Sequence, residues 1–529
     1  METTTHPSVF GRSRPRLEPF PSLWSAWLSS ALLIFLVVLH GATPHGVAGQ
    51  APLLAGLDAY VEAAMVEWEV PGLALAVVQG DSVILARGYG VTRLGGQEAV
   101  DEHTLFAIAS TTKAMTSATL ALLVEEGRLG WDDPVRSHLP HFQVEDPYVS
   151  GALTIRDLLA HRSGTARLDN LWIASPFDRA ELVQRLRHLP QAGGFRDRYD
   201  YNNHMFIVAG EVVTEVAGQA WDEVLERRIF RPLGMERSTT RAREVELRGN
   251  TAHSHTRVDG EVRAIPRRDY DVIGGAGAAW SSAWEMAQWA RFHLNEGEVE
   301  GVRILSPERI REMHTPVVVI PGDSVTARLH PSNHFQAYGL GWRLMDLHGQ
   351  RVVHHSGSIN YTRTQLTLVP DDGVAVVAMA NLSSSNLQLA LTHWILDALQ
   401  GREPEDWSAL YLELEARSRE SADRARAERE AGRLPAVAPS LPAEAYAGLY
   451  RDDLFGEIRI EATDDPEAPL TLIYSQEYEA DLHPWHGDTF RVQWRRPGAG
   501  ETFVTFRVDV RGRVVLAELD GFAAFIRDR

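Results

Sequence analysis

The sequence of 529 residues contains no cysteine. Disulfide bonds, thiolate metal sites, cysteine nucleophiles and thioether lipid anchors are therefore excluded. Lysine is nearly absent too, because Lys113 is the only lysine although lysine and arginine together number 52. Acidic residues number 71, so the formal net charge is −19, which argues against a general role in nucleic-acid binding.

Long apolar stretches are also scarce, and only one uncharged run, residues 23–39, approaches the length of a membrane span. Three arginines precede it between residues 12 and 16, and small residues follow it in "HGVAGQA". This arrangement predicts a signal peptide over residues 1–49, with an uncleaved N-terminal anchor as the alternative. Both interpretations predict an exported protein, periplasmic or extracellular, and the anchor would add attachment to the membrane.

Residues 50–400 carry strand patterns at both ends and helical patterns between them. "GLALAVVQGDSVILARGYG" predicts two strands around a turn at Gly80, and three further strands are predicted in "RVVHHS", "RTQLTLV" and "VAVVAMAN". We expect these five strands to join in one antiparallel sheet. The fold class predicted is α+β, with an antiparallel sheet flanked by helices and a mostly helical domain beside it.

The composition changes after residue 400. Residues 401–440 contain a stretch charged on nearly all faces and then the Pro-rich "LPAVAPSLP", which predict a solvated helix and a linker. Residues 441–529 alternate apolar and polar side chains, as in "VTFRVDV", where we expect Val504, Phe506, Val508 and Val510 to face one way. A small all-β domain, barrel-like or lipocalin-like, is predicted there.

The stretch "FAIASTTKAM" contains the lone lysine three residues after Ser110. We expect a helix from Ser110 to about Glu126, which puts Ser110 and Lys113 on one face, with the serine at the positive end of the helix dipole. A serine nucleophile needs a base, and lysine can lose its proton whereas arginine stays charged. The alternative is that one exposed lysine survived the arginine bias by chance.

Two further motifs follow in the chain: Tyr201-Asn202-Asn203 at a loop-to-helix junction and "HSG" at residues 355–357, at the end of a predicted strand. In chain order with "STTK", they resemble the S-x-x-K, Y-x-N and K-T-G or H-x-G elements of the serine β-lactamase and penicillin-binding-protein superfamily, in particular its class C-like branch. The flanking "LTIRDLLAHRSGT" and "YGLGW" are similar too, and the resemblance covers about residues 55–400.

The resemblance implies a role for each matching residue. Ser110 attacks a carbonyl and forms an acyl-enzyme, while Lys113 and Tyr201 share the proton transfers, and the order in which they act stays open. Asn203 hydrogen-bonds Lys113 and the substrate. The backbone N–H groups of Ser110 and Ser358 form the oxyanion hole.

His355 and Gly357 occupy the positions of the K-T-G lysine and glycine. Histidine is mostly neutral at pH 7, so it is a weaker anchor than lysine for the carboxylate of a penicillin-like substrate. Efficient β-lactam hydrolysis is therefore disfavoured, and esters or amides and peptides with D-residues are favoured. Nearby Arg363 is a candidate source of the missing charge.

The function predicted is an exported serine hydrolase, similar to β-lactamases and D-alanyl-D-alanine carboxypeptidases, that acts on amide or ester bonds. The alternatives are a true class C-like β-lactamase and a non-catalytic binding or scaffold protein of the same fold. No H-E-x-x-H motif occurs, and adjacent His354 and His355 would face opposite sides of a strand, so no metal and no cofactor are expected. A small molecule or peptide is the expected partner, and the oligomeric state stays open.

Overall fold

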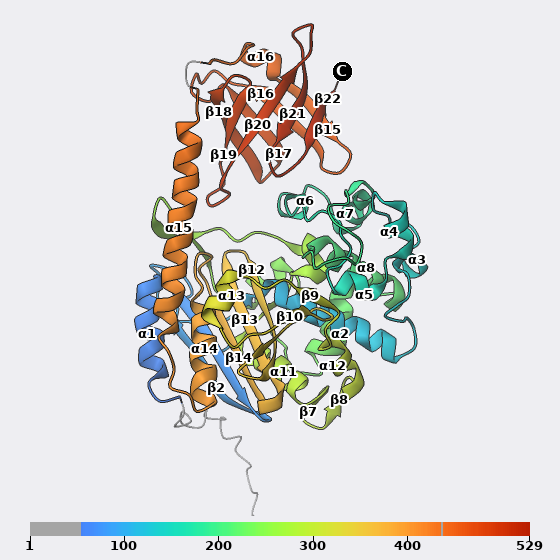
Figure 1. The fold of residues 1–529 in the computed structure, drawn as a ribbon, viewed down its shortest axis with the longest axis vertical. Helices are drawn as coiled ribbons and strands as arrows, with labels where there is room; N and C mark the ends of the chain where they lie inside the picture. The colour runs from blue at the N-terminus through green and yellow to red at the C-terminus, as the bar shows by residue number, and fades with distance from the viewer. Residues whose placement is uncertain (1–53, 435–436, 529) are drawn as a thin grey trace, which may run out of the picture. The chain divides into compact units, whose positions relative to one another are not determined.

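An eight-stranded antiparallel sheet dominates the first part of the computed structural model, which describes residues 54–434 and 437–528 (Figure 1). Its strands are β1 (Gly72–Gln79), β2 (Ser82–Gly90), β9 (Val318–Ile320), β10 (Gln336–Tyr338), β11 (Arg343–Leu347), β12 (Gln350–Ile359), β13 (Thr362–Val369) and β14 (Val374–Ala380). They follow the order β2-β1-β14-β13-β12-β11-β10-β9, so the N-terminal hairpin joins the three later strands as expected. The signal peptide or anchor predicted over residues 1–49 lies outside the described residues.

Both faces of this sheet are covered, which explains the nearly continuous apolar sequence of β1. Ala74 and Val78 contribute to the core on one face, while Leu73 and Leu75 contribute to the core on the other. Helices α1 (Leu57–Trp68), α14 (Leu387–Leu399) and the start of α15 (Trp407–Ala431) supply the second core. Helices α2 (Thr112–Glu125) and α11 (Ala283–Leu294) supply the first.

The mostly helical part lies in the chain between β2 and β9 and packs around α8 (Asn203–Ala217), which contacts α2. The side chain of Asn202 caps α8 by accepting a hydrogen bond from the His204 N–H at 2.9 Å, so Asn203 is the first residue of the helix. The other helices are α3 (Val135–His138), α4 (Pro147–Ala152), α5 (Ile155–Leu159), α6 (Asn170–Ile173), α7 (Arg179–Arg185), α9 (Trp221–Leu225), α10 (Ala242–Arg248) and α12 (Pro307–Met313).

Short two-stranded sheets and one further helix complete this part of the chain. The pairs are β3 (Phe106–Ala107) with β6 (Trp280–Ser281), β4 (Ser254–Val258) with β5 (Glu261–Ile265), and β7 (Glu298–Val299) with β8 (Val302–Arg303), and the helix is α13 (Ser324–Leu329). The α+β prediction is confirmed.

The C-terminal residues form a closed eight-stranded barrel, preceded by α16 (Ala443–Tyr446), and the expected barrel-like fold is confirmed. Its interior is filled with aromatic side chains, among them Tyr446, Phe490 and Phe506, whose ring centroids lie 5.0–5.6 Å apart. The strands are β15 (Gly448–Asp452), β16 (Gly456–Ala462), β17 (Leu470–Ser475), β18 (Tyr478–His486), β19 (Thr489–Trp494), β20 (Glu501–Val508), β21 (Val514–Leu519) and β22 (Ala524–Arg527).

One expectation about the barrel is wrong: Val510 does not share the buried face of Val504 and Phe506 but is fully exposed. Strand β20 ends at Val508, after a register shift, and the following turn breaks the alternation. The Asp509 carboxylate organises that turn by accepting a hydrogen bond from the Arg513 N–H at 2.9 Å. Across the part of the chain that the structure describes, helices long and apolar enough to cross a membrane are absent.

Stacked, buried histidines in the first core make the fold sensitive to acid. The rings of His293 and His314 lie 5.0 Å apart, and burial lowers the pKa of His314 to about 3 and that of His293 well below its ordinary value. Below pH 6.5 the unfolded chain gains protons at these sites while the folded protein does not. The free energy of unfolding should therefore fall with pH, by up to about 1.4 kcal/mol per pH unit for each such histidine.

Urea unfolding at pH 7.5, 6.0 and 5.0 measures this slope. His293→Phe should make it shallower, because within the described residues both ring nitrogens of His293 lack a hydrogen-bond partner and an apolar ring loses no contact of that kind. If the free energy of unfolding of His293→Phe depended on pH as steeply as that of the unsubstituted protein, His293 would not contribute to the acid sensitivity.

Candidate active site

Ser110 lies in a tight turn that leads into α2. The α-helix begins at Thr112, two residues later than expected, and residues Ala109–Thr111 form a single 3-10 turn before it. Ala109 adopts a left-handed φ of 50°, a conformation that costs a non-glycine residue about 1–2 kcal/mol. The turn keeps Ser110 and Lys113 on one side of the chain, and Lys113 Nζ lies 3.1 Å from Ser110 Oγ.

Lys113 is fully buried, with no exposed surface, and its amine has two further contacts. Nζ donates to Asn203 Oδ1 at 2.7 Å and to the Ala276 carbonyl at 2.6 Å, and both of these oxygens can only accept. Burial lowers the pKa of Lys113 well below its ordinary value. A charged amine would donate its third N–H to Ser110 Oγ, whereas a neutral amine would use both N–H groups on these two acceptors and turn its lone pair toward the Ser110 hydroxyl.

Asn203 is held in the orientation that this contact requires. Its Nδ2 donates to Asp169 Oδ1 at 2.9 Å, which fixes the amide so that Oδ1 faces Lys113. Asp169 also accepts from Trp172 Nε1 at 2.9 Å and pairs with Arg167 at 2.6 Å. Asp169 raises the pKa of Lys113 and Arg167 lowers it, both as smaller contributions than burial.

Tyr201 stands beside the amine, with its ring centroid 4.9 Å from Lys113 Nζ. Burial raises the pKa of Tyr201 well above 10, although a hydrogen bond with Ser110 acts in the opposite direction. The ring packs on His161 at 4.2 Å. The phenol therefore stays protonated at neutral pH and can donate a proton.

Strand β12 carries the "HSG" motif against the turn of Ser110. A Cβ atom at Gly357 would lie 2.2 Å from the Ile108 carbonyl oxygen, so no other residue lets this strand approach so closely. Ser358 lines the same cavity as Ser110. His355 does not line that cavity: its Nε2 bonds the Tyr338 hydroxyl at 2.8 Å and its Nδ1 bonds the Ser356 carbonyl at 2.7 Å.

His355 is uncharged for a physical reason. Burial lowers its pKa well below the ordinary value, and the nearby positive charges act in the same direction. The imidazole is thus a neutral hydrogen-bonding residue rather than an anion anchor. His354 and His355 both line a second cavity, which Ser110 does not line.

The cavity around Ser110 has a volume of about 540 Å³ and brings together the motif residues Ser110, Tyr201, Asn203, Gly357 and Ser358. Sequence reasoning missed several other residues that line it. These are Arg167, Asp169, Trp172, Arg343, Asn386 and Gln388.

No short motif marks these residues. Arg167 and Asp169 follow the recognisable "HRSGT" by a few positions, and that nearness was the only available signal. Arg363 lines the cavity, while its Nε donates to the Ser383 carbonyl at 2.7 Å. Within the described residues, no three histidine or acidic side chains are grouped so that they could hold a metal ion.

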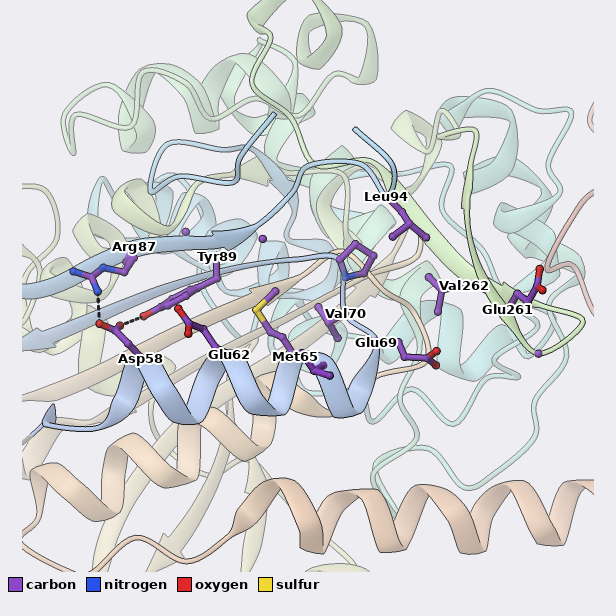
Figure 2. Close-up of a pocket in the computed structure, with 15 residues that line it drawn as sticks. Asp58, Glu62, Met65, Glu69, Val70, Arg87, Tyr89, Leu94, Glu261 and Val262 are labelled. Atoms are coloured by element: carbon purple, nitrogen blue, oxygen red, sulfur yellow. Dashed lines mark hydrogen bonds and ion pairs between the residues drawn. The ribbon is translucent and has the colours of Figure 1, made fainter. Parts of the chain in front are cut away.

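A larger hollow of about 880 Å³ lies between α1 and β2, and it shares no lining residue with the Ser110 cavity (Figure 2). Asp58 on α1 pairs there with Arg87 at 2.6 Å and accepts from the Tyr89 hydroxyl at 2.7 Å. Its lining is mainly acidic and apolar, with Arg87 and Tyr89, and contains no serine, lysine or histidine. The motif residues singled out by the sequence therefore do not line this hollow.

The Lys113 environment predicts how activity depends on pH. The rate constant kcat/KM should rise with pH as Lys113 deprotonates, with a midpoint far below 10.5 because burial lowers this pKa. Asp169→Asn removes a negative charge and should move the midpoint to lower pH, whereas Arg167→Gln removes a positive charge and should move it to higher pH. Profiles of ester hydrolysis between pH 4 and 10 test this, and shifts in the same direction would contradict it.

Comparison with known proteins gives two family matches along the chain. The family described as Beta-lactamase matches residues 57–400, and a Domain of unknown function (DUF3471) matches residues 433–528. The chain is 29% identical to Unguisins hydrolase ungD of Aspergillus violaceofuscus over 77% of this chain and 76% of that protein. It is 31% identical to Penicillin-binding protein 4 of Amycolatopsis lactamdurans over 60% of this chain and 83% of that protein.

Solved structures with the same fold cover nearly the whole chain. The octameric penicillin-binding protein homologue from Pyrococcus abyssi aligns with a TM-score of 0.60 at 21% identity, over 90% of this chain and 100% of that one. SurE aligns with a TM-score of 0.54 at 19% identity, over 90% and 99% of the two chains. At these identities the likeness concerns the fold.

Proposed function

The chain belongs to the Beta-lactamase family of serine hydrolases, and we propose that it cleaves amide or ester bonds through an acyl-enzyme on Ser110. One observation carries this proposal. The only lysine of the chain has no exposed surface, and both protons of its neutral amine are committed to acceptors, so its lone pair is free to face Ser110 Oγ. Within the described residues no carboxylate bonds this amine, so no ion pair holds Lys113 in its charged form.

The proposed reaction begins with transfer of the Ser110 hydroxyl proton to Lys113 Nζ as Oγ attacks the substrate carbonyl carbon. The carbonyl oxygen takes the negative charge and is stabilised by the backbone N–H groups of Ser110 and Ser358. Tyr201, protonated because burial raises its pKa, donates its proton to the leaving group as the tetrahedral intermediate collapses. Lys113 can then reprotonate Tyr201, and a water molecule hydrolyses the acyl-enzyme.

The motifs alone left open which of Lys113 and Tyr201 acts first. The proposed order of steps gives the two residues different roles. Lys113 has its pKa lowered and acts as the first base, whereas Tyr201 has its pKa raised and acts as the acid. Asn203 holds Lys113 and, through its contact with Asp169, cannot turn its amide without losing a hydrogen bond.

The proposed substrates are D-amino-acid peptides or amides and esters, with β-lactams hydrolysed weakly. The neutral, internally bonded His355 supports this choice, because it offers no fixed charge to a β-lactam carboxylate. Arg343 and Arg363 line the cavity and favour the second enzyme candidate, a true class C-like β-lactamase, since they could bind that carboxylate instead. The relatives named for a penicillin-binding protein and an unguisins hydrolase are compatible with either candidate.

We also infer that the protein is exported, to the periplasm or the extracellular space. The inference is supported by the arginines before the apolar run at residues 23–39 and by the small residues after it, as in a signal peptide. N-terminal sequencing of the exported protein distinguishes a cleaved signal from an anchor.

Two substitutions test the proposed nucleophile and base. Ser110→Ala should lower kcat for 4-nitrophenyl acetate by about a thousandfold or more, because the acyl-enzyme cannot form. Lys113→Arg should have a comparable effect, since it keeps a cation but removes the base. Ser117→Ala on the same helix is the matched control, and should stay within about twofold of the unsubstituted protein.

Thermal unfolding of each variant shows that the fold is intact, and Lys113→Ala replaces Lys113→Arg if the larger side chain prevents folding. Retained turnover in Ser110→Ala would refute the proposed nucleophile. Failure of the unsubstituted, folded protein to react with a fluorophosphonate probe would favour the non-catalytic scaffold. Faster turnover of nitrocefin than of esters and D-amino-acid amides would favour the β-lactamase.

A further inference from the structure

A second cavity adjoins the one that contains Ser110. It has a volume of about 390 Å³, and four residues line both cavities: Tyr201, Arg343, Ser356 and Leu389. We call it the histidine cavity, because four histidines line it: His330, His354, His355 and His393. Its walls come from α13, α14 and α15 and from strands β10, β11, β12 and β13.

Apolar side chains make up about half of the remaining lining, and five of them are removed from solvent. Met345 and Leu347 on β11, Val352 on β12, Leu396 on α14 and Tyr411 on α15 all line it, and each is less than 9% exposed. Rigid secondary structure therefore shapes most of the cavity. A volume and lining of this kind are typical of a site for a small ligand or for one large side chain.

The four imidazoles make the cavity polar without making it charged. The rings of His330 and His393 lie 4.4 Å apart, so protonation of one disfavours protonation of the other. Burial lowers the pKa of His330 to about 4, that of His354 to about 3, and that of His393 well below its ordinary value. All three are neutral at pH 7, and so is His355, whose pKa is also lowered by burial.

Three of these rings, His330, His354 and His393, also have unused hydrogen-bonding capacity. Gln365 Nε2 approaches His354 Nδ1 at 3.5 Å, the limit of a hydrogen bond. Across the described ranges, the ring nitrogens of His330 and His393 have no protein hydrogen-bond partner. A ligand group in the cavity would thus meet apolar surface and uncharged donors or acceptors.

The position of the cavity relative to Ser110 indicates which part of a substrate reaches it. The cavity is bordered by Tyr201 and Ser356 but not by Ser110, Gly357 or Ser358. It therefore opens next to the phenol that is proposed to protonate the leaving group, and away from the oxyanion side. A substituent on the leaving group therefore has a shorter path into the histidine cavity than a substituent on the acyl side of the scissile bond.

We infer that the histidine cavity binds the side chain of the residue on the leaving-group side of the scissile bond, and that this side chain is bulky, uncharged and apolar or aromatic. The inference rests on the proposed hydrolase function, because the leaving group is defined by it. A charged side chain would have to leave water for a wall of neutral imidazoles and aliphatic groups, where only Arg343 and Asp323 carry charge.

Binding to the Ser110→Ala protein tests this without turnover. The ligands are three N-acetyl-D-alanyl dipeptide amides whose second residue is D-phenylalanine, glycine or D-lysine, titrated by calorimetry at pH 7.5. The phenylalanine amide should bind at least about tenfold more tightly than the glycine amide, because burying its ring removes apolar surface from water. The lysine amide should bind no more tightly than the glycine amide.

Filling the cavity should remove this preference. His393→Trp, at a half-buried position, and Leu396→Phe each place a larger side chain in the cavity, and the phenylalanine preference should fall to about twofold or less. His188→Trp, at an exposed histidine outside both cavities, is the control and should keep the preference.

Equal binding of the three amides, or a preference that survives both cavity-filling variants in folded protein, would overturn the inference. Hydrolysis of 4-nitrophenyl acetate by the unsubstituted protein separates this result from failure of the proposed function. Turnover without a side-chain preference refutes the cavity assignment alone, and absence of turnover refutes the proposed hydrolase on which that assignment depends.

Discussion

The complete burial of one lysine amine is the constraint on which the proposed chemistry depends. An ammonium ion without a carboxylate partner is costly in a protein interior, so burial favours the neutral amine. Lys113 has two neutral acceptors, Asn203 Oδ1 and the Ala276 carbonyl, and bonds no carboxylate among the residues that the structure describes. Asp169 lies one residue further out, beyond Asn203, where its charge moderates the effect of burial without pairing with the amine.

The fold produces this environment by bringing three separate parts of the chain together. Helix α2 carries the lysine, the start of α8 carries Asn203, and the segment before β6 supplies Ala276. Strand β12 closes the remaining side through Gly357, whose missing side chain lets the strand rest on Ile108. The strained turn at Ala109 is followed directly by α2, and strand β12 packs against it.

Much of the sheet was predictable from sequence, because its signals are local. The hairpin of β1 and β2 and the strands β12 to β14 have clear apolar patterns, and the S-x-x-K spacing places Ser110 and Lys113 together within a single helical turn. The helix start was misplaced by two residues because the 3-10 turn at Ala109–Thr111 depends on contact with β12. Val510 was misassigned because a register shift ends the alternation of β20.

The parts of the site that could not be predicted depend on tertiary structure. Asp169 has an ordinary loop sequence around it, and only the packing of α6 and α8 puts its carboxylate against Asn203. The same holds for the histidine cavity. Its histidines lie just after α13, on β12 and on α14, and no spacing in the sequence indicates that these segments come together. Sequence patterns therefore located the reacting groups, while the surroundings that adjust their pKa values and shape the pocket required the fold.

The solitary, inaccessible lysine also determines how the folded protein responds to amine-directed reagents. Acylating labels, reductive methylation and lysine-specific cross-linkers need an exposed side-chain amine, and Lys113, which has no exposed surface, is the only such group in the sequence. Reagents of this kind should therefore leave the Ser110 site of the folded protein chemically untouched.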